Sequence, residues 1–143
     1  MRFWDTSPLA ALCLREPTVP IVQGLLDQDP GVVVWWATHT ECLSAIIRRA
    51  RAVSFGPELT VQARARLSSL ADQWLEVEPS GGVRFTAERL LAIYPLRAAD
   101  AFQLAAALEW AAGSPGGIGF VCLDNRLREA ARREGFAVLP EQV

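Results

Sequence analysis

The chain contains no lysine, one histidine and three cysteines among its 143 residues. One histidine, and cysteines without a CxxC spacing, supply too few ligands for a structural zinc site. Cys13, Cys42 and Cys122 each lie in an apolar stretch. We therefore expect them to be reduced core residues of a cytoplasmic protein.

Long apolar runs are also missing. No run approaches the roughly 20 residues that a membrane-spanning helix needs. Asp5, Arg15 and Glu16 interrupt the N-terminal segment, which is therefore unlike a secretory signal. The sequence thus predicts no membrane association.

The charge is close to balanced, with a net value of -2, which neither favours nor excludes nucleic acid as a partner. All 14 basic residues are arginine. GC-rich codon usage explains this bias, although guanidinium groups also suit phosphate oxygens.

Half of the residues are hydrophobic, and 143 residues are enough for one domain with a substantial core. We expect a single domain over residues 1–143. Apolar and β-branched runs alternate with helical patterns, which indicates an α/β/α fold with a central, mainly parallel sheet. The expected strands cover 2–4, 32–37, 74–77, 118–123 and 136–139. The expected helices cover 9–16, 19–26, 40–52, 58–73, 86–94, 96–108 and 126–133.

Four acidic residues are expected at one edge of this sheet. Asp5 and Asp124 directly follow expected strands, whereas Glu41 and Asp100 lie in the first turns of helices. Ligands of parallel α/β sheets bind outside the carboxyl ends of the strands. We therefore expect the four carboxylates to converge there.

Converging carboxylates repel one another, and a divalent cation would remove that repulsion. Oxygen ligands without histidine or cysteine suit Mg²⁺ or Mn²⁺. Such an ion can lower the pKa of water and polarise a phosphoryl oxygen, which is the chemistry of phosphodiester hydrolysis.

Each acid also has a structural explanation. Asp5 and Asp124 could cap helices, and Glu41 could compensate the dipole of its helix. Asp100 is harder to explain in this way, because the helix behind it is apolar on nearly every face and an acid at the edge of a core needs a partner.

Four motifs resemble those of PIN-domain ribonucleases, in particular VapC-type toxins of toxin–antitoxin pairs. They are Phe3-Trp4-Asp5-Thr6-Ser7, Thr40-Glu41 with Ser44-Ala45, Leu96-Arg97-Ala98-Ala99-Asp100-Ala101 with Leu104-Ala105, and Phe120-Val121-Cys122-Leu123-Asp124 with Arg126-Leu127. Arg15-Glu16-Pro17 after the first helix is also typical of the family. The resemblance covers essentially the whole chain.

The resemblance implies a PIN-like fold in which Asp5, Glu41, Asp100 and Asp124 bind Mg²⁺ or Mn²⁺ and Thr6 orients Asp5. It implies an endoribonuclease that cleaves single-stranded or looped RNA, forms a homodimer and is inhibited by a cognate antitoxin. Two departures lie outside the acid set. Gln103 stands where many members carry histidine, and Pro8 stands where a small residue is commoner.

An RNA substrate would need basic residues around an acidic pocket. Arg97 and Arg126 are the best candidates, because they are three and two residues from an expected site acid. The other candidates, which solubility alone also explains, are Arg48, Arg49, Arg51, Arg128, Arg132 and Arg133. We expect Trp35 and Trp36 in the core, Trp4 beside or beneath the pocket, and His39 at a helix start.

Two other functions are compatible with the sequence. One is a metal-dependent phosphohydrolase or DNA nuclease on a related scaffold; the haloacid-dehalogenase type, however, needs a DxD motif where Asp5 is followed by Thr6-Ser7. The other is a non-enzymatic module whose acids cap helices and whose apolar surface docks a partner. Such a module would not be stabilised by Mg²⁺ or Mn²⁺.

Overall fold

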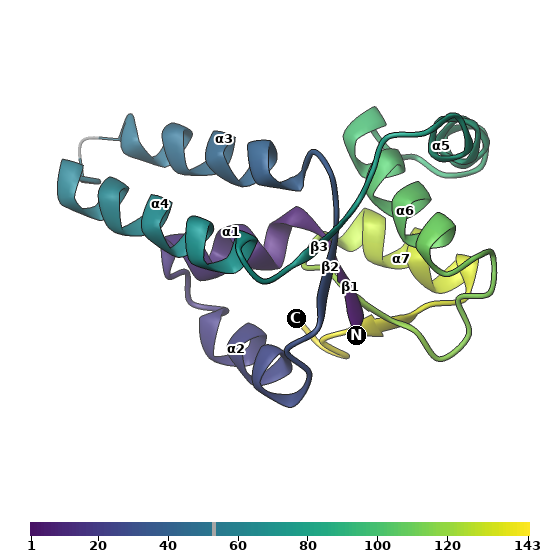
Figure 1. The fold of residues 1–143 in the computed structure, drawn as a ribbon, viewed down its shortest axis with the longest axis horizontal. Coiled ribbons are helices and arrows are strands. Elements are labelled where there is room, and N and C mark those ends of the chain that lie inside the picture. Colours follow the sequence, from purple (N-terminus) through teal and green to yellow (C-terminus); the bar gives the residue numbers. More distant parts are fainter. Residues whose placement is uncertain (53) are drawn as a thin grey trace.

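A computed structural model describes residues 1–52 and 54–143, and it has the expected α/β architecture (Figure 1). The strands in the described residues are β1 (Arg2–Trp4), β2 (Val32–Trp35), β3 (Leu75–Val77), β4 (Gly119–Val121) and β5 (Ala137–Leu139). The helices are α1 (Thr6–Leu14), α2 (Val19–Gln28), α3 (Thr38–Ala50), α4 (Pro57–Ala71), α5 (Gly81–Ile93), α6 (Ala98–Trp110) and α7 (Asn125–Glu134).

The five strands form one sheet in the order β3-β2-β1-β4-β5, and every neighbouring pair is parallel. β1 is central and pairs with β2 on one side and β4 on the other. The chain runs from β1 outward through β2 to β3 and then crosses to the other side of β1 to form β4 and β5. This reversal creates a topological switch point at the carboxyl end of β1. The first predicted acid, Asp5, directly follows this strand.

Helices cover both faces of the sheet, so the central strands are buried on both sides (Figure 1). Alternate residues of β1 face different layers: Trp4 packs in the core with α1, α3 and α4, whereas Phe3 packs in the core with α5, α6 and α7. Both side chains are completely buried. This explains why the strands are near-continuous apolar runs rather than alternating ones.

Among the element boundaries that differ from the sequence prediction, the starts of α1 and α5 are explained by capping residues. α1 begins at Thr6, because Asp5 itself is the capping residue and accepts a hydrogen bond from the Ser7 backbone N–H. α5 begins at Gly81 rather than near residue 86, because Ser80 caps it by accepting from the Val83 N–H. A Cβ at Gly82 would lie 3.0 Å from the Glu109 carboxylate of α6, so α5 and this side chain of α6 pack closely at that point.

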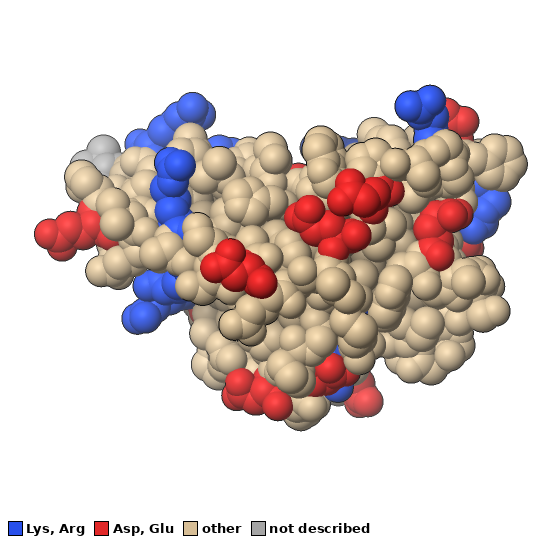
Figure 2. Space-filling model, in the orientation of Figure 1, with Lys and Arg blue, Asp and Glu red and all other residues tan. Residues whose placement is uncertain are grey.

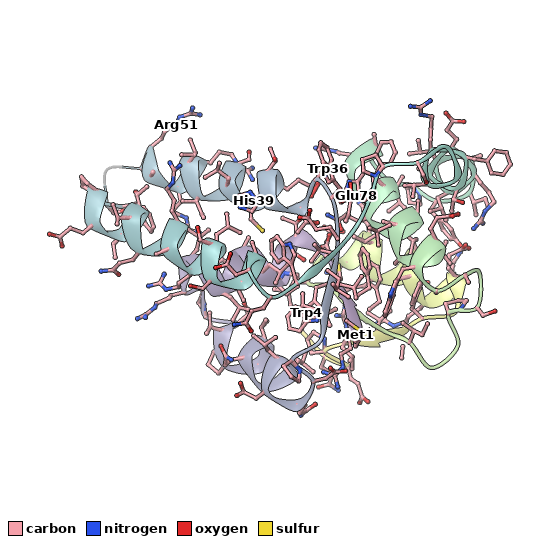
Figure 3. All side chains as sticks on the ribbon, viewed as in Figure 1. Met1, Trp4, Trp36, His39, Arg51 and Glu78 are labelled. Carbon is pink, nitrogen blue, oxygen red and sulfur yellow. The ribbon has the colours of Figure 1, made fainter. Side chains whose placement is uncertain are left out.

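The tryptophan predictions have mixed outcomes. Trp35 is buried and stacks on Phe102 of α6, with ring centroids 5.6 Å apart. Trp36 is 52% exposed, so its predicted core position is wrong. β2 ends at Trp35, and Figure 3 shows Trp36 beside Glu78 beyond the ends of β2 and β3. Trp4 packs beneath the site edge rather than beside it.

In the described part of the chain, no single helix is long and apolar enough to cross a membrane. In that part only α1 and α2 taken together are long and apolar enough, and the pair is bent by 114°. Cys13, Cys42 and Cys122 are free thiols, and all three are buried as expected.

Candidate active site

All four predicted acids line one hollow at the carboxyl edge of the sheet. The hollow has a volume of about 580 Å³. Asp5 enters it from the end of β1, Glu41 from the first turn of α3, Asp100 from the first turn of α6, and Asp124 from the start of α7. These elements meet above the centre of the sheet, with α3 on one face and α6 and α7 on the other (Figure 1). The structure therefore brings together residues separated by more than 100 positions in sequence.

Asp5 is the most buried of the four acids, with 5% of its surface exposed. Its Oδ2 accepts hydrogen bonds from the Ser7 hydroxyl at 2.6 Å and the Ser7 N–H at 3.1 Å, and the Cys122 thiol lies 3.5 Å away. Burial raises the pKa of Asp5 to about 6, although these hydrogen bonds act in the opposite direction. Asp5 is therefore held in one orientation at a cost in desolvation.

The residue that orients Asp5 through its hydroxyl is Ser7, whereas the sequence analysis assigned this role to Thr6. The Ser7 Oγ also accepts from the Leu123 N–H at 2.9 Å, which ties α1 to the end of β4. The Asp-x-Ser spacing at a helix start carries the signal for this contact, because a capping aspartate binds the N–H groups two or three positions later. The Thr6 hydroxyl donates instead to Glu41.

Glu41 is held by a network that the sequence analysis missed. Its Oε2 accepts from Thr6 and from the Gln103 side-chain amide at 2.8 Å. The same amide nitrogen lies 2.8 Å from the Thr6 hydroxyl and 3.0 Å from the Thr38 hydroxyl. Gln103 is only 1% exposed and lies three residues after Asp100, on the same face of α6. That spacing was the available signal for its position near the site.

Asp100 and Asp124 approach the hollow from the other layer. Partial burial raises the pKa of Asp100, and the nearby charges of Asp124 and Glu41 raise it further, whereas Arg97 lowers it. Asp124 caps α7 through its Oδ1, which accepts from the Leu127 N–H at 2.9 Å. The capping interpretation of Asp124 is thus confirmed, and its carboxylate still lines the hollow.

The hollow carries an excess of negative charge, because four carboxylates and only one arginine, Arg48, belong to its described lining. Within the described residues, none of the four acids forms an ion pair. No three acidic, histidine or cysteine side chains in that part of the chain are close enough to ligate one ion as they stand. Carboxylate oxygens are nevertheless the ligands that a hard divalent cation such as Mg²⁺ prefers, and the excess of negative charge would attract such a cation.

One of the candidate arginines lines the hollow, and it is not one of the two that the sequence favoured. Arg97 is close enough to Asp100 to lower its pKa, but neither Arg97 nor Arg126 lines the hollow. The arginine that does line it is Arg48 of α3. His39 packs edge-on against Trp74, with ring centroids 6.2 Å apart, and lies between α3 and α4 rather than in the hollow (Figure 3).

No protein-family model matches the chain, and no curated protein matches it in sequence. Several solved structures, however, are similar to it in fold. VapC20 of Mycobacterium tuberculosis, described as a sarcin-ricin loop cleaving toxin, is 20% identical with a TM-score of 0.67, covering 91% of this chain and 95% of that one. FitAcB from Neisseria gonorrhoeae is 17% identical with a TM-score of 0.65, covering 96% of each chain. PAE2754 from Pyrobaculum aerophilum is 18% identical with a TM-score of 0.65, covering 96% of this chain and 88% of that one.

These three structures share the fold of this chain over at least 88% of both chains. At such identities the likeness establishes the fold: the chain has the PIN-like α/β/α fold that the motif resemblance predicted.

Proposed function

We propose that this protein is a metal-dependent endoribonuclease and the toxin of a toxin–antitoxin pair. The observation that carries the proposal is the single hollow lined by Asp5, Glu41, Asp100 and Asp124, with no ion pair to any of them in the described residues. Four carboxylates without a cationic partner are electrostatically unfavourable unless a cation joins them. The PIN-like fold supports the same interpretation.

In this proposal Asp5 and Asp100 hold the principal Mg²⁺ or Mn²⁺ ion, and Glu41 and Asp124 complete the site. The ion would supply Lewis acidity toward a phosphoryl oxygen and lower the pKa of a water molecule. The protein's own part is to fix its carboxylates before substrate arrives. Ser7 fixes Asp5, and Gln103 with Thr6 fixes Glu41, whose carboxylate would then complete the metal site or position the attacking water.

RNA is the proposed substrate, and a cognate antitoxin and a second copy of the chain are the proposed partners. The RNA proposal is supported by the neighbour described as cleaving the sarcin-ricin loop. The antitoxin proposal is supported by the motifs that resemble those of VapC-type toxins. A further neighbour of the same fold is FitAB, described as bound to an IR36 DNA fragment. Its structure is 19% identical to this chain with a TM-score of 0.65.

The test is incubation of the purified protein with total cellular RNA in Mg²⁺, in Mn²⁺ and in EDTA. We expect discrete fragments that depend on the metal. Asp100→Asn should reduce the cleavage rate by a factor of at least about 100, since charge stabilisation is a large part of such catalysis. Asp72→Asn is the matched control, because this exposed acid at the end of α4 lies outside the hollow.

Two results would contradict the proposal. The first is equal cleavage by the wild type and Asp100→Asn, which would point to a contaminating nuclease. The second is the absence of cleavage by folded, antitoxin-free protein together with no thermal stabilisation by either metal. That second result would favour the non-enzymatic binding module.

A further inference from the structure

A second hollow joins the acid-lined one along α3. It has a volume of about 420 Å³ and is lined by Leu14, Glu16, Ala45, Arg48, Arg49 and Ala52. Ala45 and Arg48 line both hollows. The two are therefore parts of one groove, which leads from the four acids toward the end of α1.

The α3 side of this groove follows the helical repeat. Glu41, Ser44, Ala45 and Arg48 are spaced at i, i+3, i+4 and i+7, and all four line the acid hollow. Seven residues of α-helix advance by about 10 Å. Arg48 therefore lies about two turns from the acidic end of the groove, with only the small side chains of Ser44 and Ala45 between them.

Arg48 and Arg49 differ in their charge partners. Arg49 donates to Glu16 at 3.0 Å, so its charge is already compensated. Arg48 is exposed and makes no ion pair or side-chain hydrogen bond with the described residues. Because no carboxylate of the described residues pairs with the Arg48 guanidinium, its fork of donors is available for phosphate oxygens, whose geometry it matches. Figure 2 shows arginines at the α3 and α4 end of the visible face, and others at the opposite end.

We propose that Arg48 binds a backbone phosphate of single-stranded RNA next to the cleaved bond, and that the strand continues along α3 past Glu16. The assignment rests on the proposed ribonuclease function for the nature of its ligand. It makes Arg48 a substrate-positioning residue, and it moves the main RNA contact away from Arg97 and Arg126, which lie outside both hollows.

The test measures binding of a short, fluorescently labelled single-stranded RNA in EDTA, so that it does not depend on cleavage. Loss of one phosphate contact lowers the slope of log affinity against log salt by about 0.7 for a single strand, which is roughly fivefold in affinity near 0.1 M salt. We expect this loss for Arg48→Ala and partial recovery for Arg48→Lys. Arg51→Ala is the matched control, because Arg51 lies beyond the same helix in neither hollow.

A second variant tests the groove in the opposite direction. Glu16→Gln removes an anion from the second hollow and frees Arg49 from its ion pair. We expect RNA to bind roughly two- to fivefold more tightly, the range of one exposed charge interaction. Weaker or unchanged binding by this variant would contradict the strand path past Glu16.

The outcomes separate this inference from the proposed function. If Arg48→Ala and Arg51→Ala weaken RNA binding by the same factor, or if neither changes the slope of log affinity against log salt, Arg48 is not a phosphate site. This conclusion would hold even if the protein cleaves RNA. If Arg48→Ala alone weakens binding while no metal produces cleavage, the RNA groove stands and the nuclease proposal falls. For an active enzyme, the Arg48→Ala defect should appear in KM more than in kcat.

Discussion

Asp5 is the residue at which stability and proposed chemistry oppose each other. Its burial raises its pKa from 3.8 to about 6. Between about pH 4 and pH 6 the folded chain keeps a proton that the unfolded chain has already released. Stability therefore falls as the pH rises through this window, and the full penalty is present above it.

We predict that Asp5→Asn stabilises the protein at neutral pH in the presence of EDTA. A shift of about two pKa units corresponds to a gain of up to about 3 kcal/mol in the free energy of unfolding. The Asn side chain keeps an oxygen for the Ser7 donors. Urea denaturation at neutral pH and near pH 4 measures the effect, with Asp72→Asn as the control.

The gain should shrink to well under about 1 kcal/mol at about pH 4, where Asp5 is protonated in the folded chain and only about half ionised in the unfolded chain. An equal gain at both pH values would mean that the stabilisation has another origin than the buried charge.

At the residue scale, the positions of the acids could be predicted, but their hydrogen-bond partners could not. Asp5 follows a strand and Asp100 lies in the first turn of a helix. Strand ends and helix starts can be predicted from local sequence patterns, so the edge of the sheet at which these acids lie could be predicted as well. The Gln103 contact with Glu41 joins residues 62 positions apart. The predicted core position of Trp36 was wrong for a related reason. Trp36 belongs to an apolar run that is typical of a buried strand, but β2 ends at Trp35 and Trp36 is exposed.

Among the elements, α7 has a structural role beyond presenting Asp124. Its Arg128 is only 3% exposed, and its guanidinium donates to the carbonyl of Cys122 at 2.7 Å and to that of Pro140 at 2.6 Å. One side chain therefore ties the end of β4 to the segment after β5. Burial lowers the pKa of Arg128, which reflects the cost of holding this charge among neutral carbonyl partners.

We predict that Arg128→Met destabilises the protein by about 3 kcal/mol, since two carbonyls lose a charged donor and one is buried beside the site. The methionine fills much of the same volume, so the loss reports the hydrogen bonds. Arg132→Met on the same helix is the control, because its ion pair with Glu129 is exposed. Urea denaturation of both variants measures the difference, and equal stabilities would contradict this role.

Helix α6 was the easiest element to predict from the sequence, and α5 was the hardest. An apolar run that includes four consecutive buried residues, Leu104 to Ala107, marks α6 as a core helix. The start of α5 was misplaced because Gly81 and Gly82 disfavour helices when considered locally. They nevertheless form the first turn of α5, which Ser80 caps by accepting from the Val83 N–H.

At the scale of the whole molecule, the candidate site joins the two helical layers. Asp5 and Glu41 belong with β1 and the α3 layer, whereas Asp100 and Asp124 belong to α6 and α7. A parallel sheet and its acidic edge could be predicted from the alternation of elements. The strand order could not, because β1 pairs with strands that lie 30 and more than 110 residues further along.

We predict that Mg²⁺ or Mn²⁺ stabilises the folded protein by relieving repulsion between acids from the two layers. A metal concentration about ten times Kd adds about 1.4 kcal/mol, or a rise in Tm of roughly 3–6 °C for a chain of this size. A thermal melt with and without metal measures it. Asp100→Asn should lose most of the shift and Asp72→Asn should keep it; an equal shift in all three proteins would indicate non-specific ion effects.

The three buried thiols are distributed between the two faces of the sheet. Cys13 and Cys42 belong to the core beneath α1 and α3, and Cys122 to the core beneath α6. Burial raises the pKa of each thiol, so an alkylating reagent reacts only when the covering layer opens. The rate of alkylation of each cysteine therefore reports the rate at which the helical layer on its own face of the sheet opens. Mass spectrometry of alkylated peptides would time the opening of the two layers independently, without any engineered label.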